Sequence, residues 1–395
     1  MSIMSDRKRK PATLCVQGVH SQTSGPAVVP IVQTSTFVFE NQQQMLDSVQ
    51  GKTGKDVYTR WSNPTTKNVE EKMNALEGTE DTHVLASGMA AISSAIMGLV
   101  KNGERVLSSD SIYGGTFNLF KKILSQSCIE IDYVDTDALA DILEDSGSKY
   151  KMCFFETPTN PTLKIIDIKK VADAAQSTET ISLVDSTFGS PINQRPYTLG
   201  IDLVMHSATK YLGGHSDIIA GTISGSKELM SEVRSAAKLL GGTMDPFASF
   251  LLDRGIKTLE VRVAKHNSNA SYLAENLSRD SRVREVHYPG LPSHPQHDIA
   301  KKQMYGFGGM MAVTLDTDLA GTSRFVDSLN IFLNAVSLGG VESLASIPAL
   351  TTHYGIDEKS LNEMGISKST VRLSVGIEDQ EDLLDDLMAG LDVLS

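Results

Sequence analysis

Residues 206–217 read His-Ser-Ala-Thr-Lys-Tyr-Leu-Gly-Gly-His-Ser-Asp and follow an apolar run at residues 201–205 that is typical of a buried strand. Lys210 lies at the centre, after the hydroxyl residues Ser207 and Thr209 and before two glycines. A lysine at such a strand end can form a Schiff base with an aldehyde, and the hydroxyls beside it can bind a phosphate. The stretch alone fits equally well a lysine that ends a strand and points to solvent.

A second strand-like run, Ile181-Ser-Leu-Val-Asp-Ser-Thr-Phe188, ends in the carboxylate of Asp185. Because ligands of open α/β sheets bind where parallel strands end, we expect Asp185 and Lys210 to face one crevice. Pyridoxal phosphate requires such a pair, a lysine for its aldehyde and an aspartate that keeps its pyridine nitrogen protonated. Asp185 has the alternative role of capping a helix or loop. Its pairing with Lys210 favours the cofactor.

Two further segments fit a phosphate-bearing, flat cofactor. Ser87-Gly88-Met89 follows an apolar run and precedes a helical pattern, and the start of a helix attracts anions. An ordinary helix cap explains this segment as well. Tyr113, followed by Gly114 and Gly115, can stack on a planar ring or pack on the core as a turn aromatic.

The combined motifs resemble the pyridoxal-phosphate enzymes of cysteine and methionine metabolism, from about Pro11 to the C-terminus. This group includes cystathionine γ-lyase, cystathionine γ-synthase, methionine γ-lyase and O-acetylhomoserine sulfhydrylase. The motifs that carry the resemblance are Tyr58-Thr-Arg60, Asn63-Pro64-Thr65, Ser87-Gly88-Met89, Tyr113-Gly-Gly-Thr116, Glu156-Thr-Pro-Thr-Asn160-Pro-Thr162, Asp185, Ser207-Ala-Thr-Lys210, Ser337-Leu-Gly-Gly-Val-Glu342-Ser343 and Val371-Arg-Leu-Ser-Val-Gly376.

The resemblance implies a role for each matched position. Lys210, Asp185 and Tyr113 are the expected catalytic residues, with Tyr113 stacked on the cofactor ring. The other expected cofactor-binding residues are Ser87, Gly88, Met89, Asn160, Thr187, Ser207 and Thr209, together with Tyr58 and Arg60, which reach the phosphate of the neighbouring subunit. The expected substrate-binding residues are Arg372, Ser337, Glu342 and Asn160.

Arg372 also stands out by pattern. In Val371-Arg-Leu-Ser-Val375, alternation places Val371, Leu373 and Val375 on one face of a strand and Arg372 on the other. The pattern alone favours an exposed arginine on an edge strand. The family resemblance instead implies that Arg372 grips the substrate α-carboxylate through two parallel hydrogen bonds.

The chain is predicted to have an α/β fold of three parts. Residues 1–60 lack clear periodicity and predict an extended arm for oligomer contacts. Residues 61–250 predict a large pyridoxal-phosphate-binding domain, a mostly parallel sheet with helices on both faces. Residues 251–395 predict a smaller α+β domain, reached through one long helix over 246–275. The resemblance implies the aspartate-aminotransferase-like architecture called fold type I. The expected strands are 83–86, 105–109, 130–134, 152–156, 181–185, 202–206, 283–287, 309–315 and 371–375, with a helix near 67–77.

Composition narrows the class of protein. The 395 residues carry a net charge of −12, which argues against nucleic acid and acidic membranes as partners. Three cysteines at irregular spacing suit a reducing cytoplasm, and no apolar run reaches membrane-spanning length. The basic tip within residues 1–10 lacks the apolar core of a signal peptide. No metal site is expected, because prolines break the spacing of His287, His294 and His297.

Local differences within the family predict the reaction. Gly115 stands where methionine γ-lyases have cysteine, and Glu342 and the Tyr288–His297 segment resemble the cystathionine γ-lyase and γ-synthase branch. Gln33–Phe39 looks more like methionine γ-lyase, and Ser186 replaces a usual asparagine without a known consequence. We therefore expect γ-elimination or γ-replacement on a sulfur amino acid, by a cystathionine γ-lyase or γ-synthase. Methionine γ-lyase and O-acetylhomoserine sulfhydrylase are the alternatives.

Two readings from other classes are weaker. A non-catalytic fold-type-I binding protein would tolerate loss of Lys210, Asp185 or Arg372, yet all three are present. A nicotinamide dehydrogenase would need a glycine fingerprint after a strand, and Gly306-Phe-Gly308-Gly309 lacks both that strand and the third glycine. The resemblance further implies a homotetramer, a dimer of dimers with shared active sites, that takes a small amino-acid substrate.

Overall fold

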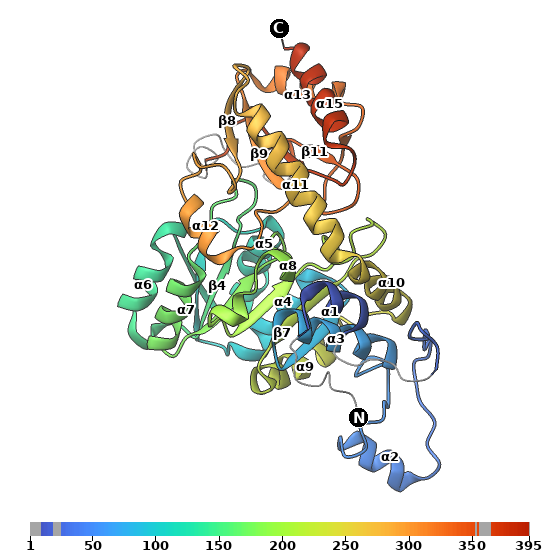
Figure 1. The fold of residues 1–395 in the computed structure, drawn as a ribbon. Coiled ribbons are helices and arrows are strands. Elements are labelled where there is room, and N and C mark those ends of the chain that lie inside the picture. The colour runs from blue at the N-terminus through green and yellow to red at the C-terminus, as the bar shows by residue number, and fades with distance from the viewer. Residues whose placement is uncertain (1–8, 19–24, 352–353, 355–364, 395) are drawn as a thin grey trace.

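The computed structural model describes residues 9–18, 25–351, 354 and 365–394. Its framework consists of a seven-stranded and a five-stranded sheet, with the smaller sheet near the C-terminus of the chain (Figure 1). Within the described ranges, no helix has the length and apolar character needed to cross a membrane.

The larger sheet is mostly parallel, as predicted. Its strands in spatial order are β1 (Asp81–Leu85), β7 (Gly221–Gly225), β6 (Leu203–His206), β5 (Ile181–Asp185), β4 (Met152–Glu156), β2 (Arg105–Ser109) and β3 (Glu130–Val134). Neighbours from β6 to β3 pair in parallel, whereas β7 runs antiparallel to both β1 and β6. The parallel strands therefore end at one edge. The predicted site residues there are Asp185, at the end of β5, and residues of the segments that follow β4, β5 and β6.

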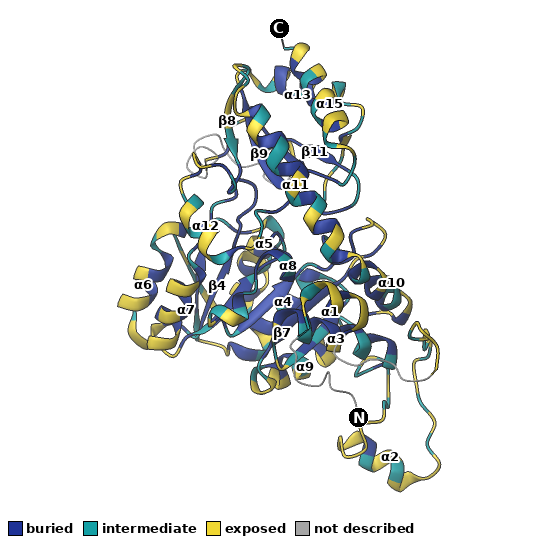
Figure 2. Ribbon diagram, in the orientation of Figure 1, coloured by how far each residue is buried: buried dark blue, intermediate teal, exposed yellow. Residues whose placement is uncertain are grey.

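Helices cover both faces of this sheet because its strands are apolar on both sides. On β4, Phe154 packs into one core cluster, while Cys153 and Phe155 pack into another on the opposite face. The first cluster lies under α4 (Gly88–Leu99) and α9 (Lys227–Leu240), and the second under α6 (Leu139–Asp145) and α7 (Ile168–Ser177). Figure 2 shows these strands buried and the outer helix faces exposed.

The smaller sheet belongs to the C-terminal part of the chain. Its strands in spatial order are β10 (Leu333–Asn334), β11 (Leu344–Ser346), β12 (Thr370–Ser374), β9 (Met310–Leu315) and β8 (Val283–His287), antiparallel except for the β10–β11 pair. Helices α13 (Leu319–Ser328) and α15 (Gln380–Asp392) pack beside it, which confirms the predicted α+β arrangement. Further helices of the described part are α3 (Pro64–Glu77), α5 (Gly114–Lys122), α8 (Ser190–Asn193) and α12 (His297–Gln303).

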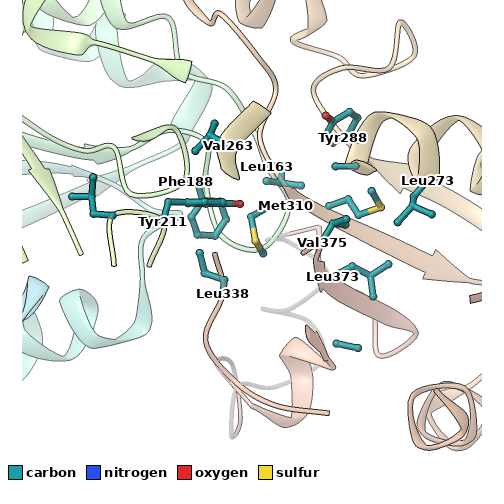
Figure 3. Close-up of a cluster of buried hydrophobic side chains, with 14 of the residues drawn as sticks. Leu163, Phe188, Tyr211, Val263, Leu273, Tyr288, Met310, Leu338, Leu373 and Val375 are labelled. Atoms are coloured by element: carbon teal, nitrogen blue, oxygen red, sulfur yellow. The ribbon is translucent and has the colours of Figure 1, made fainter. Parts of the chain in front are cut away.

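One apolar cluster joins the two sheets (Figure 3). Phe188 and Tyr211, from segments that follow strands of the larger sheet, belong to the same buried cluster as Met310 and Leu373 of the smaller one. Helix α11 (Leu259–Leu277) contributes Val263 and other buried side chains to this cluster. The two sheets therefore share a core. Close packing in this core fixes the position of one sheet relative to the other.

The long helix predicted over 246–275 is two helices, α10 (Pro246–Lys257) and α11. They separate at Thr258, whose backbone is not helical (φ −109°, ψ 7°) and whose hydroxyl donates to the Gly255 carbonyl. A threonine that bonds its own helix in this way competes with the helical ladder. The predicted domain boundary at residue 250 accordingly lies inside α10.

The N-terminal segment is not uniformly extended. Helix α1 (Pro11–Gln17) begins with proline in its first turn and packs on α3, α10 and α11 through buried Leu14 and Cys15. Helix α2 (Gln42–Val49) is capped by the Asn41 side chain. Both helices have eight residues or fewer, which is too short to give a clear periodic pattern.

Candidate active site

A cavity of about 350 Å³ opens where β4, β5 and β6 end. Its volume falls within the range of small-molecule sites, roughly 300–1,000 Å³. Strand register places Glu156 beside Asp185, and Asp185 beside Met205. The lining includes twelve of the predicted residues: Ser87, Gly88, Met89, Tyr113, Asn160, Asp185, Thr187, Ser207, Thr209, Lys210, Ser337 and Arg372.

Lys210 is held inside this cavity by Ser337, which lies between β10 and β11 of the smaller sheet. Its Nζ donates to Ser337 Oγ at 2.7 Å, and the Ser337 carbonyl accepts from Arg372 Nη2 at 3.0 Å. Burial lowers the pKa of the Lys210 ammonium to about 8, and the nearby Arg372 charge acts in the same direction. A larger fraction of this amine is therefore neutral and nucleophilic at neutral pH than for an ordinary lysine.

Asp185 is oriented by Thr187, two residues later. The backbone N–H of Thr187 donates to Asp185 Oδ1 at 2.9 Å, and the Thr187 hydroxyl donates to the same oxygen. That hydroxyl also accepts from Ser207 N at 2.8 Å, which links the ends of β5 and β6. Burial raises the pKa of the Asp185 carboxyl, and the two bonds from Thr187 oppose this shift. Both bonds end on Oδ1, so Oδ2 can bind a ligand.

The first turn of α4 forms one wall of the cavity. Ser87 caps the helix by accepting from Ala90 N at 3.0 Å, while Gly88 and Met89 belong to the turn whose N–H groups lack helical partners. A Cβ on Gly88 would lie 3.0 Å from the Ser207 side chain, so glycine permits this close approach. The wall is suited to an anion. Thr209 lines the cavity as well, and its hydroxyl exchanges hydrogen bonds with the Ala220 backbone.

Tyr113 stands at the start of α5, with 45% of its surface exposed. Its backbone N–H donates to Glu156 Oε1 at 2.6 Å. A Cβ on Gly115 would lie 2.4 Å from Tyr113 Cε1, so the ring rests directly against the first turn of its own helix. Glycine at position 115 therefore leaves room for the Tyr113 ring to lie against this turn.

Arg372 enters the cavity from β12, which lies between β9 and β11 and is not an edge strand. Only 4% of Arg372 is exposed, and its Nη1 donates to Asn160 Oδ1 at 3.1 Å. Burial lowers its pKa to about 10. Among the described residues no carboxylate lies within ion-pair distance of Arg372. The arrangement suits a carboxylate ligand.

Residues 12–392 match the model of the Cys/Met metabolism PLP-dependent enzymes. The chain belongs to this family. A cystathionine β-lyase of Lactococcus lactis subsp. cremoris is 44% identical over 372 residues, which cover 94% of this chain and 95% of the relative. A cystathionine γ-lyase of Bacillus subtilis is 40% identical over 97% of this chain and 99% of the relative.

Solved structures agree with this assignment. A crystal structure of cystathionine γ-synthase from Xanthomonas oryzae pv. oryzae, in complex with aminoacrylate and cysteine, matches with a TM-score of 0.91. It is 37% identical, and the match covers 98% of each chain. The fold-type-I prediction is thereby confirmed, and the protein is a pyridoxal-phosphate-dependent enzyme of the trans-sulfuration type.

Three predicted site residues of this family member lie outside the cavity. Glu342 accepts a hydrogen bond from the Ser216 hydroxyl and is not part of the lining. Tyr58 and Arg60 line a different surface pocket together with Asp245, and the Arg60 guanidinium lies 5.5 Å from the centre of the Tyr58 ring. Within one chain, neither residue reaches the Lys210 cavity, which leaves the shared-site prediction open.

The cavity also contains residues that carried no predicted role. Glu156 and Phe188 are the most prominent, together with Ile219 and Val336. Glu156 could have been found by the same rule as Asp185, since both are carboxylates at the last position of a buried strand. The apolar residues give no such signal. Among the described residues, no group of three or more histidine, cysteine, aspartate or glutamate side chains could hold a metal ion.

Proposed function

We propose that this chain catalyses γ-elimination or γ-replacement on a sulfur amino acid, as a cystathionine γ-lyase or cystathionine γ-synthase. One observation carries the proposal: a single cavity brings together Lys210, Asp185 and Arg372 from three distant segments. The donor set fits pyridoxal phosphate, with a partly buried amine, a carboxylate whose Oδ2 is accessible and a helix start suited to a phosphate.

Residues on different walls of the cavity would bind the aldehyde, the ring and the phosphate of the cofactor. When bound, pyridoxal phosphate supplies an aldehyde and a ring that withdraws electrons from the amino acid. Lys210 would hold the aldehyde, and Asp185 would hold the proton on the ring nitrogen. The backbone of Gly88 and Met89 with the Ser207 hydroxyl would bind the phosphate, and Tyr113 would cover the ring.

The substrate would be oriented from the other sheet. Arg372 would bind its α-carboxylate, since it lines the cavity and pairs with no acidic side chain among the described residues. Its Nη1 and Nη2 donate to Asn160 and to the Ser337 carbonyl, which orient the guanidinium. Lys210 Nζ would be the base that takes the proton from the substrate Cα, because its lowered pKa favours the neutral amine. Ser337 Oγ then offers Nζ a hydrogen-bond partner within the cavity. Apolar Phe188 and Leu338 exclude competing water.

Identification of the products distinguishes the candidate reactions. The purified protein would be incubated with cystathionine, with methionine, and with an activated homoserine ester plus either cysteine or inorganic sulfide. We expect 2-oxobutanoate and cysteine from cystathionine, or cystathionine from the ester. Methanethiol formed faster than either would identify a methionine γ-lyase, and incorporation of inorganic sulfide into the ester in place of cysteine would identify a sulfhydrylase.

A second candidate is cleavage at the β-carbon of cystathionine. It is favoured by one observation, the 44% identity with a Lactococcus lactis protein named cystathionine β-lyase. In that case cystathionine would give homocysteine and pyruvate, and no 2-oxobutanoate. Because the two reactions break bonds on opposite sides of the same sulfur, one product analysis decides between them.

We further propose a cytoplasmic homotetramer built as a dimer of dimers. The support is the position of Tyr58 and Arg60, which lie on the surface outside the cavity of their own chain. An arginine and a tyrosine there suit the phosphate of a neighbouring subunit. Each dimer would then contain two sites, each completed by residues of both chains.

A further inference from the structure

Glu156 has no role in the proposed function, although it lines the cavity. It is the last residue of β4, only 5% exposed, and strand register places it directly beside Asp185 of β5. Its Oε1 accepts the backbone N–H of Tyr113 at 2.6 Å, across 43 residues of sequence. The carboxyl group therefore connects a strand end of the sheet with the residue that covers the cavity.

The position of Tyr113 depends on this connection. Tyr113 occupies the position before α5, and its side chain makes no capping hydrogen bond with that helix. Tyr113 is 45% exposed, and its ring rests on Gly115, which has no side chain to hold it. The bond from Tyr113 N to Glu156 thus fixes the backbone from which the ring extends.

We propose that Glu156 is a positioning residue of the active site, which holds Tyr113 over the cavity and keeps its own proton beside ionised Asp185. The proposal deepens the function proposed above and rests on it for the identity of the bound ring. Glu156 itself acts by orienting Tyr113 and by remaining uncharged beside Asp185, and it transfers no group.

The charges around the cavity support a protonated Glu156. The titratable groups that line it are Glu156, Asp185, Lys210, Arg372 and Tyr113. Burial raises the pKa of Glu156 well above its usual value of 4.5, and the negative charge of Asp185 acts in the same direction. The bonds from Thr187 favour ionisation of Asp185 instead. Because two adjacent buried carboxylates resist ionising together, Asp185 carries the charge and Glu156 keeps the proton.

Two variants separate the hydrogen bond from the charge. Glu156→Gln keeps an oxygen acceptor of the same size without a titratable proton, whereas Glu156→Ala removes the acceptor. Asp167→Ala is the matched control, because Asp167 accepts a backbone N–H from Lys170 at the start of α7 and does not line the cavity. Each protein would be prepared with and without pyridoxal phosphate.

Hydrogen exchange of the Tyr113 amide tests the geometry without the cofactor. In Glu156→Ala we expect this amide to exchange at least about tenfold faster, as the loss of one buried hydrogen bond implies. Glu156→Gln and Asp167→Ala should leave its exchange unchanged. Equal exchange in wild type and Glu156→Ala would overturn the proposed hold on Tyr113, whatever the protein catalyses.

Cofactor measurements test the consequence for the site. Glu156→Ala should bind pyridoxal phosphate about tenfold more weakly and change the visible circular dichroism band, while Glu156→Gln stays within about threefold of wild type. A change in Glu156→Gln as large as in Glu156→Ala would show that Glu156 acts as an ionised group. If wild type binds no pyridoxal phosphate, the proposed function fails and the exchange result still decides the hold on Tyr113.

Thermal unfolding of the cofactor-free protein tests whether Glu156 is protonated in the folded state. A carboxyl group whose pKa is raised in the folded state makes the fold bind more protons than the unfolded chain, so stability falls as pH rises from about 4.5 towards the folded-state pKa. Glu156→Gln lacks this loss. Its Tm relative to wild type should therefore increase between pH 5 and pH 7. A difference in Tm that does not change with pH would refute the protonated state.

Discussion

Lys210 and Arg372 are two cations held close together and largely away from water. Burial lowers the pKa of both, to about 8 for Lys210 and about 10 for Arg372. In the described part of the chain neither forms an ion pair with a carboxylate, and both are bonded through Ser337. Such a site attracts an anionic ligand. The Lys210 ammonium, which has the lower of the two pKa values, is the easier cation to deprotonate.

The pKa of Lys210 predicts how fast the cofactor is captured. Only the neutral amine attacks an aldehyde, so the rate of reconstitution of the cofactor-free protein should rise about tenfold from pH 7 to pH 9 and then level off. The measurement is the visible absorbance after mixing with pyridoxal phosphate. Arg372→Ala should move the plateau to higher pH, because the Arg372 charge lowers this pKa. A rate that keeps rising tenfold per pH unit up to pH 10 would contradict the burial argument.

Arg372 predicts a selective defect in substrate capture. Arg372→Ala removes a charge-assisted contact worth about 1.5–3 kcal/mol, so kcat/KM for amino-acid substrates should fall roughly 10- to 150-fold. The affinity for pyridoxal phosphate should change far less, as an absorbance titration would show.

Arg372→Lys is the matched control for that variant. It keeps the positive charge but loses the paired geometry of the guanidinium, so it should recover part of the lost kcat/KM. Unchanged kcat/KM in Arg372→Ala would remove Arg372 from the substrate site.

At the scale of helices and strands, the sequence predicted the elements whose pattern is local. The strands at 105–109, 130–134, 152–156, 181–185 and 283–287 have the predicted limits, because each is a short apolar or alternating run. Strand β7 was not predicted, since Gly221 and Gly225 weaken its strand signal. Both glycines are required by contacts from distant segments: a Cβ on Gly221 would lie 2.2 Å from Ser87 O, and one on Gly225 would lie 2.6 Å from Leu203 Cδ2.

In the site, too, local sequence patterns predict single residues but not the hydrogen bonds between distant segments. Asp185 could be predicted from the strand end on which it lies, and Lys210 from its place in the turn that follows the next strand. Arg372 could be predicted from alternation on β12 together with the family resemblance. The bond between Lys210 and Ser337 spans 127 residues and depends on how the two sheets pack. The bond between Tyr113 and Glu156 likewise joins segments that no local pattern relates.

At the scale of the whole molecule, the N-terminal segment is the part of the chain that bears on how subunits assemble. Helix α1 is anchored on the core, but Tyr58 and Arg60 face a surface pocket away from the Lys210 cavity. Val38, in the segment between α1 and Tyr58, is 96% exposed. A segment that extends from its own core with exposed side chains is suited to contact a second copy of the chain.

A mixture of two inactive variants tests shared sites. Lys210→Ala and Arg60→Ala chains would be unfolded together in equal amounts, refolded and assayed. Random pairing makes about half of the dimers mixed, and each mixed dimer has one site with both residues intact, so about one quarter of wild-type activity should return. Mixed dimers without recovered activity would show that Arg60 serves the site of its own chain.

The position at which pyridoxal phosphate attaches to the protein tests most directly whether the Lys210 cavity is the active site. The cofactor-loaded protein would be reduced with borohydride to fix the bond between the aldehyde and a lysine, then digested and analysed by mass spectrometry. We predict one pyridoxyl group per chain, on the Lys210 side chain, and none in Lys210→Ala. Attachment to another lysine, or none in the wild-type protein, would contradict the assignment of this cavity as the active site.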